Sequence, residues 1–550
     1  MTDHRPPTSR RTRAIGFWLG LGCFLLLLAF PVDAANAPAS GLAAVVSLMA
    51  IWWVSNALPL FATAILPLAL FPLLGIMSGN DVAPVYFNGT IVLFLGGFMI
   101  ALSMQRWNLH KRIALGIIHA VGGGPSRIIL GYMVAAAFLS MWIANTATAV
   151  MMVPIGLAMV FQVEETAGVR HSRTFTVALM LGIAYACSMG GVTTLVGTTP
   201  NLSFQRIFQI IFPQAPPIEF GTWMVLATPV GITMVAVCWF LLTQVLYRPS
   251  PEVRIDRDVL ERERAELGPI SFEERSVLVV FAITAVLWIF RRDLELGFGT
   301  IPGWSNLLPF PGMVDDGTVA ITMAAVLFFI PTRNQPPRGT SEATADTVRK
   351  WPKSLRRAVR FASANRVMGA EVIPRLPWNI VLLFGGGFAL AAGFTDTGLA
   401  NIIGNRFQGL GGLPPVVVIL LVCLTLTFLT ELTSNLATTE MILPILASVA
   451  VVTEMNPLTL MLPATLSASC AFMMPVATPA NAIVFGSDRI SVGEMARAGI
   501  LLNLIGVIVV TTVVILLGEA VFDFDRGVMP DWATEPAADP QAPRRGPVTP

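Results

Sequence analysis

Two short polar phrases lie inside long apolar stretches of this chain, and they carry the same residue types. Asn145 corresponds to Asn435, and Thr148 corresponds to Thr438, at an offset of 290 positions. Asparagine and threonine offer neutral oxygen and N–H groups, which bind small ions without carrying a charge themselves. Placing such polar groups in the hydrocarbon core of a bilayer costs free energy, so those that occur there usually have a function. We therefore interpret the pair as a binding site for a small solute.

Glycine and proline positions repeat along with these polar phrases. Residues 96–98 match residues 386–388 at the offset of 290, and residues 196–201 match residues 476–481 at an offset of 280. The chain is therefore a duplication whose best-matched positions are polar, glycine and proline residues. Such a pattern is typical of a transporter whose binding site lies between two repeats.

The composition indicates an integral membrane protein. Of the 550 residues, 55% are hydrophobic and only 12% are charged, with a mean hydropathy of +0.72, whereas soluble proteins have about 25% charged residues. The five cysteines are scattered, which favours small buried side chains over a disulfide framework or a metal site. No phosphate-binding loop, HExxH or GxSxG motif is present, which argues against ATP-driven transport by this chain and against hydrolysis.

Eleven apolar segments are expected to cross the membrane as helices, since many of the apolar stretches are long enough to span a bilayer. They lie near 15–32, 42–58, 60–76, 90–105, 174–210, 221–247, 275–290, 318–330, 378–394, 459–487 and 497–521. Glycine, threonine and proline residues should interrupt two of these segments, at 187–201 and at 470–481.

Two further apolar stretches, 127–161 and 415–450, are broken by the polar phrases. We expect each to form a re-entrant helical hairpin that enters and leaves on one side, since each half is near the lower limit for spanning. A pair of ordinary spanning helices with a polar turn is the alternative. The fold class predicted is an all-α polytopic membrane protein with an inverted repeat.

Basic residues set the expected orientation. Arginines flank the first helix on its N-terminal side, and segment 331–377 has ten Lys or Arg against three acidic residues. Both should be cytoplasmic, and the C-terminus should lie outside. An odd number of crossings separates the repeats, so they should be inverted. The first helix could instead be a cleaved signal peptide. Residues 351–366 could form a basic amphipathic surface helix or a solvated loop.

These expectations divide the chain into five regions. They are a cytoplasmic N-terminus with the first helix (1–40), a first repeat (41–247), a cytoplasmic linker (248–274), an inverted second repeat (275–521) that contains the insert 331–377, and a disordered tail (522–550).

A hairpin tip can bind ions of both signs. The carbonyl groups at a helix C-terminus suit a cation, and the N–H groups at a helix N-terminus suit an anion. The two tips and the two interruptions contain no Lys, Arg or His. An anion there would be held by amides, hydroxyls and bound cations. The alternative is that these small residues serve only close helix packing.

At these residues the chain resembles the divalent-anion:sodium symporter (DASS) family. The resemblance covers about residues 40–520, and it rests on WIANTAT (142–148), GGVTTLVGT (190–198), TSNLATT (433–439) and FMMPVATPANAIVFG (472–486). It implies a homodimer of scaffold and transport domains, elevator-type movement, Na⁺ as the coupling ion, and no organic cofactor.

The resemblance also implies particular site residues. The sodium ligands would be Ser140, Asn145 and Gly197 in one site, and Thr430, Ser434, Asn435 and Ala477 in the other. The substrate would contact Asn145, Thr146, Thr198, Ser434, Asn435, Thr478 and Pro479. Two residues depart from the family pattern: Ala144 replaces a serine, and Leu436 replaces a threonine. We expect the first to weaken one sodium site and the second to alter the choice of anion.

The function predicted is secondary transport of C4-dicarboxylates such as succinate, malate or fumarate, driven by Na⁺, in the inner membrane, with no nucleic-acid partner. The alternative within transport is a carrier of sulfate or another small anion that is proton-coupled or an exchanger. A membrane enzyme or a channel is the alternative from another class. An enzyme would need clustered titratable residues, and only Glu431 and Glu440 lie beside the second tip.

Overall fold

The computed structural model describes residues 10–251, 253, 258–295, 299–333 and 366–534, and most of them are helical. The first half of the chain and the linker consist of α1 (Arg10–Ala29), α2 (Ala37–Ser55), α3 (Leu60–Ala64), α4 (Leu66–Leu73), α5 (Gly79–Val85), α6 (Gly89–Arg106), α7 (Leu109–Val121), α8 (Pro125–Ser140), α9 (Asn145–Ala167), α10 (Val169–Val192), α11 (Thr199–Ile211), α12 (Phe220–Phe240), η1 (Leu241–Leu246) and α13 (Asp258–Glu266).

The second half consists of α14 (Phe272–Ile289), β1 (Leu294–Glu295), β2 (Thr300–Ile301), η2 (Trp304–Leu307), η3 (Pro311–Met313), α15 (Asp316–Phe329), η4 (Ala370–Arg375), α18 (Trp378–Thr397), α19 (Leu399–Gly404), η5 (Asn405–Gly412), α20 (Pro415–Leu429), α21 (Asn435–Val452), α22 (Pro457–Ala468), α23 (Pro479–Phe485), α24 (Val492–Val513), η6 (Val514–Gly518), α25 (Glu519–Phe522) and α26 (Asp531–Thr534). Strands β1 and β2 pair antiparallel.

The helices lie where the apolar segments predicted them. Nine helices in the described part of the chain are long and apolar enough to cross a membrane, and five shorter apolar helices accompany them. Each of the eleven segments predicted to span contains helix. The chain is therefore a multi-pass membrane protein whose architecture is almost entirely helical.

The four predicted interruptions are confirmed. Residues 141–144 separate α8 from α9, and residues 430–434 separate α20 from α21. Non-helical segments at 193–198 and 469–478 separate α10 from α11 and α22 from α23. Proline stands in the first turn of both α11 and α23, where its fixed φ angle favours the start of a helix.

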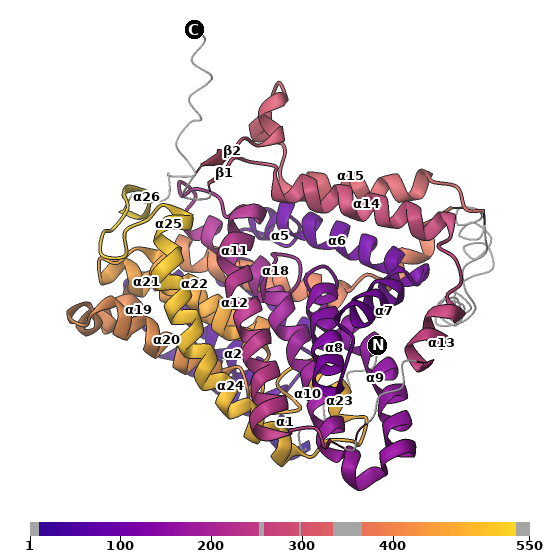
Figure 1. Ribbon diagram of the computed structural model, residues 1–550. Coiled ribbons are helices and arrows are strands. Elements are labelled where there is room, and N and C mark those ends of the chain that lie inside the picture. Colours follow the sequence, from indigo (N-terminus) through magenta and orange to yellow (C-terminus); the bar gives the residue numbers. More distant parts are fainter. Residues whose placement is uncertain (1–9, 252, 254–257, 296–298, 334–365, 535–550) are drawn as a thin grey trace, which may run out of the picture.

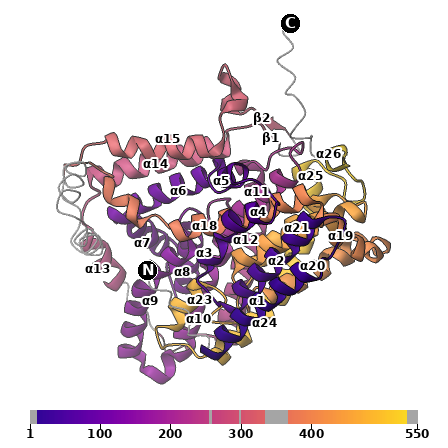
Figure 2. The same ribbon diagram turned by 180° about the vertical axis from the view of Figure 1, so that it is seen from behind.

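Around these interruptions, helices of each repeat pack against helices of the other repeat. Helix α11 of the first repeat packs against α21 of the second, and α23 of the second packs against α9 of the first. Helix α10 is buried from Phe175 to Val192, as expected for a helical segment that is apolar on all sides. Figures 1 and 2 show α8 and α9 toward one side of the molecule and α20 and α21 toward the other, with α11 and α12 between them. Helix α1 packs along α2.

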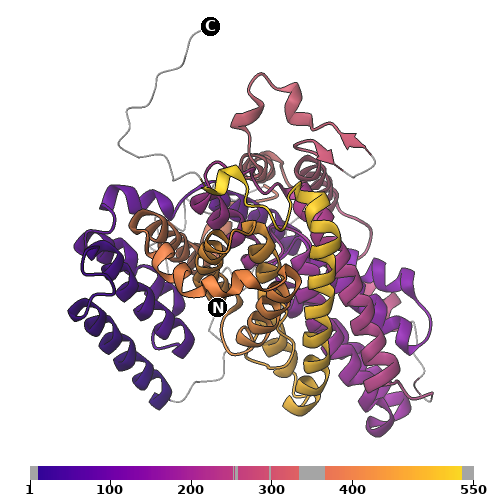
Figure 3. The ribbon, with the colours of Figure 1, turned by 90° about the vertical axis from the view of Figure 1, so that its left-hand side faces the viewer.

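Peripheral helices surround this centre. Helices α14 and α15 lie side by side along one end, and α15 packs on α6 (Figure 1). In Figure 3 the first helices, coloured indigo, lie at one edge, and the violet and magenta helices lie at the opposite edge. The orange and yellow helices of the second half lie between them.

One expectation is wrong, and several short elements were missed, among them α5, α19 and the two strands. The chain was expected to be disordered from residue 522, but Trp532 of α26 packs edge-on against Phe208 (5.5 Å between ring centroids) and Phe212 (5.3 Å). Burial of these aromatic rings fixes the segment. Helices α7 and α13 were not predicted as elements. The basic segment 351–366 lies outside the described residues except for Arg366.

A buried ion network joins three helices at one end. The guanidinium of Arg291, which follows α14, bonds Asp316 of α15 (Nε–Oδ1, 2.6 Å) and pairs with Glu219, the residue before α12. The side chain of Arg291 is 5% exposed and that of Asp316 is 4% exposed. Removing one member of a buried pair leaves its partners charged and unpaired, which is strongly destabilising.

We predict that Arg291→Met lowers the free energy of unfolding by about 3–5 kcal/mol. The matched control is Arg173→Met, because Arg173 pairs with Glu494 but is 46% exposed, and exposed pairs contribute about 0–1 kcal/mol. Thermal unfolding in detergent measures both variants. Equal shifts in Tm for the two variants would show that the Arg291 network does not hold the three helices together.

Candidate functional site

The first hairpin tip brings a hydroxyl and an amide together. Helix α8 ends at Ser140 and α9 begins at Asn145, and Ser140 Oγ lies 2.6 Å from the side-chain amide of Asn145. The residue before α9 is Ala144, whose side chain cannot cap the helix. The first N–H groups of α9 therefore remain open to a ligand.

Acceptor oxygens converge on the Asn145 amide. With its nitrogen facing inward, the amide would donate to Ser140 Oγ (2.6 Å), Cys187 O (3.1 Å) and Gly197 O (3.2 Å). With its oxygen facing inward, that oxygen joins three other oxygens that can all accept. Such an oxygen cluster suits a hard cation. The structure thus brings together Ser140, Asn145 and Gly197, the three residues expected at one sodium site.

The second tip repeats this geometry with the same spacing. Thr430 Oγ1 lies 2.7 Å from Asn435 Oδ1 and 2.9 Å from Ala468 O. One hydroxyl proton faces two acceptors, so oxygen is again in excess. In both tips a hydroxyl meets an asparagine five residues later. Ser434 precedes α21 and makes no side-chain capping bond, and Ala477 lies in the neighbouring interruption.

An asparagine clamp stabilises each interruption. Asn201 Nδ2 donates to Gly191 O (3.4 Å), Val192 O (3.0 Å) and Thr194 O (2.7 Å). Asn481 Nδ2 donates to Ala471 O and Met474 O, both at 3.1 Å. The clamps therefore reach carbonyls ten and seven residues back in both repeats. Free carbonyl groups inside an apolar bundle need such partners.

The two repeats secure their tips differently. In the first, Thr194 Oγ1 donates to Met141 O and accepts from Gly197 N (3.1 Å). In the second, a carboxylate takes this part: Glu431 accepts from the backbone N–H groups of residues 472–474 at 2.6–3.0 Å and from Asn503 Nδ2 at 2.7 Å. The matched segments 196–201 and 476–481 include Asn201 and Asn481, and Glu431 was noted beside the second tip. The sequence did not reveal the contacts of these residues.

Glycine allows the first tip to approach α10. A Cβ atom built on Gly191 would lie 2.3 Å from Asn145 Oδ1, and one built on Gly197 would lie 2.5 Å from Gly191 O. No side chain fits at either position without displacing the tip. Backbone and amide oxygens are therefore held close together by the absence of side chains.

All the expected substrate-binding residues lie at helix N-termini. Asn145 and Thr146 begin α9, Thr198 precedes α11, Ser434 and Asn435 begin α21, and Thr478 and Pro479 begin α23. Thr478 Oγ1 is occupied, because it accepts from Asn481 N (3.1 Å), whereas Thr198 makes no capping bond. Four N-termini thus offer partial positive charge near the tips, without a basic side chain.

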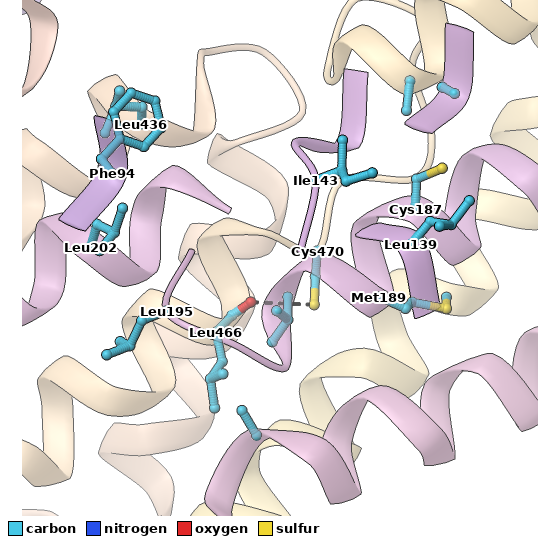
Figure 4. Packing of buried hydrophobic residues seen from close by; sticks show 14 of the residues in the cluster. Phe94, Leu139, Ile143, Cys187, Met189, Leu195, Leu202, Leu436, Leu466 and Cys470 are labelled. Carbon is cyan, nitrogen blue, oxygen red and sulfur yellow. Dashed lines mark hydrogen bonds between the residues drawn. The ribbon is translucent and has the colours of Figure 1, made fainter. Parts of the chain in front are cut away.

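We expected Leu436 to influence the choice of anion at the second tip, but its side chain does not line the tip surface. Its side chain is 5% exposed and belongs to the same apolar cluster as Phe94 and Leu202 (Figure 4). By contrast Asn145, Thr146, Thr198, Ser434 and Asn435 are all half-buried. Leu436 therefore packs the second tip against α6 and α11 and does not contact an open site.

The residues gathered at the tips are neutral ligands for ions. Within the described ranges, no group of three or more His, Cys, Asp or Glu side chains is placed to hold a metal ion. The arrangement instead provides two oxygen clusters for cations and several helix N-termini for an anion. Reversible binding of ions is the chemistry that this arrangement suits.

Comparisons with known proteins agree with this assignment. Residues 13–523 match the family model described as "Sodium:sulfate symporter transmembrane region". The chain is 37% identical over 520 residues to the sodium-dependent dicarboxylate transporter SdcS of Staphylococcus saprophyticus, which covers 93% of this chain and 92% of the relative. It is 37% identical over 518 residues to SdcS of Staphylococcus aureus, with the same coverage.

Two solved structures share the fold. The YdaH transporter of Alcanivorax borkumensis matches with a TM-score of 0.51 at 13% identity, covering 92% of this chain and 98% of that chain. MtrF of Neisseria gonorrhoeae matches with a TM-score of 0.53 at 12% identity, covering 89% and 96%. These matches support a transporter fold.

We predict that Gly191→Ala disrupts the first tip, because its methyl group would overlap the Asn145 amide. Accessibility of a cysteine introduced at Thr146 to a thiol reagent should change by at least about tenfold, since relieving the overlap requires a shift of the tip. The control is Gly116→Ala, which meets no atom within 4 Å. Unchanged labelling in Gly191→Ala would show that the tip does not depend on this contact.

Proposed function

This chain belongs to the sodium:sulfate symporter family, and from that premise we propose that it carries C4-dicarboxylates across the membrane together with Na⁺. It is a transporter and not an enzyme. One observation carries the proposal: both tips pair a hydroxyl at the end of one helix with an asparagine, five residues later, that begins the next helix. The dicarboxylate relatives match this chain over nearly its whole length.

In this proposal the cations bind first and complete the anion site. One Na⁺ is held by Ser140, Asn145 and Gly197, and the other by Thr430, Ser434, Asn435 and the backbone of Ala477. Their charge, together with the N-termini of α9, α11 and α21, stabilises the two carboxylates. Asn145, Thr146, Thr198, Ser434, Asn435, Thr478 and Pro479 contact the substrate. Because no basic residue takes part, affinity for the anion depends on bound Na⁺.

The proposed movement is of the elevator type. Helices α8–α12 and α20–α24 pack on one another around the interruptions, and α6 and α18 border them. Gly97 of α6 faces Val196, and Gly387 of α18 faces Glu440. At these positions the absence of a side chain lets the neighbouring unit approach the backbones of α6 and α18 closely. We propose that the unit with both tips moves past α6 and α18, in each protomer of a homodimer.

The proposed location is the inner membrane, with the N-terminus in the cytoplasm and the C-terminus outside. The arginines before α1 and the basic segment 331–377 support this orientation through the positive-inside tendency. The two hairpins then enter from opposite sides, as the inverted repeat requires.

Uptake of labelled succinate by proteoliposomes tests the function. We expect an inward Na⁺ gradient to drive accumulation and an equal K⁺ gradient to give none. Asn145→Ala and Asn435→Ala should each reduce the initial rate by at least about tenfold, since each loses an oxygen ligand and a donor worth roughly 1–3 kcal/mol. The control is Asn401→Ala, because Asn401 is exposed on α19.

Three results would contradict this function. Na⁺-driven uptake of sulfate but not of succinate would reassign the substrate. Equal uptake in Na⁺ and K⁺ would show that transport is not coupled to sodium. Normal uptake by either asparagine variant at normal expression would contradict a binding site formed by both tips.

Ala144→Ser tests the first sodium site separately. Serine at this position caps α9, which stabilises a helix by about 0.5–2 kcal/mol, and adds an oxygen beside Ser140 and Asn145. We predict a several-fold gain in Na⁺ affinity, measured as the increase of Tm with Na⁺ concentration. Ala147→Ser, inside α9, is the control. A gain in Tm that is independent of Na⁺ would show helix capping without cation binding.

A further inference from the structure

A carboxyl group is buried beneath the second tip without a cationic partner. Glu440 lies on α21, five residues after Asn435, and is 0% exposed. Its Oε1 accepts a hydrogen bond from Ser203 Oγ of α11 at 2.5 Å, and its Oε2 has no hydrogen-bonding partner. The corresponding position in the first repeat is Val150, which is 53% exposed. The carboxyl group therefore belongs to one repeat only.

Gly387 provides the space for this carboxyl group. A Cβ atom built on Gly387 would lie 1.6 Å from Glu440 Oε2 and 2.1 Å from its Cδ. The neighbouring glycines of α18 receive other elements: Gly385 faces the ring of Tyr86, and Gly386 faces the backbone of Ala64. The carboxyl group of Glu440 thus sits in a notch on α18, at the border between the tip-bearing unit and α18.

No neighbouring group balances a negative charge on Glu440. Helix α21 packs against α2, α11, α18, α19, α22 and η5. The titratable or charged groups on these elements are Arg206 of α11, Asp396 of α18 and Arg406 of η5. None of the three pairs with Glu440 in the part of the chain that the structure describes; its one bond is to Ser203. A carboxylate isolated in this way is far less stable than the neutral acid.

A proton fits this place and a metal cation does not. A hard cation requires several oxygen ligands around it, and Ser203 Oγ is the one oxygen bonded to the carboxyl group. The other carboxyl oxygen rests against α18 at Gly387, which leaves no room for an ion. A proton needs no additional volume and removes the charge.

We propose that Glu440 is a proton-binding site whose loading is required for the second tip to pack against α18. This inference rests on the proposed transport function. The proton forms an O–H bond with one carboxyl oxygen while Glu440 is in the notch. When the tip-bearing unit leaves α18, water reaches the carboxyl group and accepts the proton. The unit then returns to the notch only after Glu440 has taken a proton from water.

Transport should therefore slow as the pH rises. Above the pH at which Glu440 loses its proton in water, the loaded fraction falls up to about tenfold for each pH unit. Glutamine has the shape of the neutral acid but does not titrate. The transport rate of Glu440→Gln should therefore not depend on protonation at this position. The substrate and other residues titrate equally in both proteins.

The experiment measures Na⁺-driven succinate uptake at equal pH on both sides of the vesicle, between about pH 6 and pH 8.5. The quantity of interest is the ratio of the wild-type rate to the Glu440→Gln rate. We expect this ratio to fall by at least about tenfold over the range. Glu165→Gln is the control, because Glu165 is exposed on α9; its ratio to the wild type should stay constant.

Ser203→Ala provides a second test that keeps the carboxyl group. The Ser203 hydroxyl donates to Glu440 and so favours its charged form. Its removal should move the midpoint of the pH profile upward. This variant decides the question if Glu440→Gln does not fold.

The outcomes separate this site from the proposed function. No uptake by the wild type at any pH would refute the function itself. Normal uptake with a constant wild-type to Glu440→Gln ratio, or an unmoved midpoint in Ser203→Ala, would overturn the proton site alone. A constant ratio together with loss of uptake in Arg206→Gln would assign the balancing charge to Arg206.

Discussion

Helical hydrogen bonding is interrupted four times inside an apolar bundle, and every backbone group released there must find a partner. In lipid an unpaired N–H or C=O group costs several kcal/mol. Asn201 and Asn481 satisfy carbonyls at matching distances along the chain, and Glu431 satisfies three successive N–H groups. What is left unsatisfied lies at the tips, where acceptor oxygens and helix N-termini face a half-buried space. We propose that these unpaired oxygens and N–H groups at the tips form the ion sites.

Duplication places these interruptions where they support one another. Helix α11 packs against the second hairpin and α23 against the first, so each repeat completes the site of the other. The repeats are not equivalent in chemistry, however. Thr194 secures the first tip and a carboxylate secures the second, and a buried glutamate occurs in the second repeat only.

Much of this arrangement was predictable from the sequence. The apolar helices and the four interruptions follow from apolar length and from the Asn, Gly and Pro positions, because these features act locally. The contacts of Glu440 with Ser203 and Gly387 could not be predicted, since they join residues 237 positions or 53 positions apart. Helix α7 was missed because its basic residues reduce its apolar signal. The burial of Leu436 and the docking of Trp532 likewise depend on tertiary packing.

The central claim is that both tips bind one anion together with cations. Cryo-electron microscopy of the protein in Na⁺ and succinate tests it most directly, against a sample in K⁺ without succinate. The account predicts density for the anion at the N-termini of α9, α11 and α21. It also predicts density for one cation beside Asn145 and another beside Asn435, all absent from the second sample. Anion density away from both tips, or anion density that persists without Na⁺, would contradict the account.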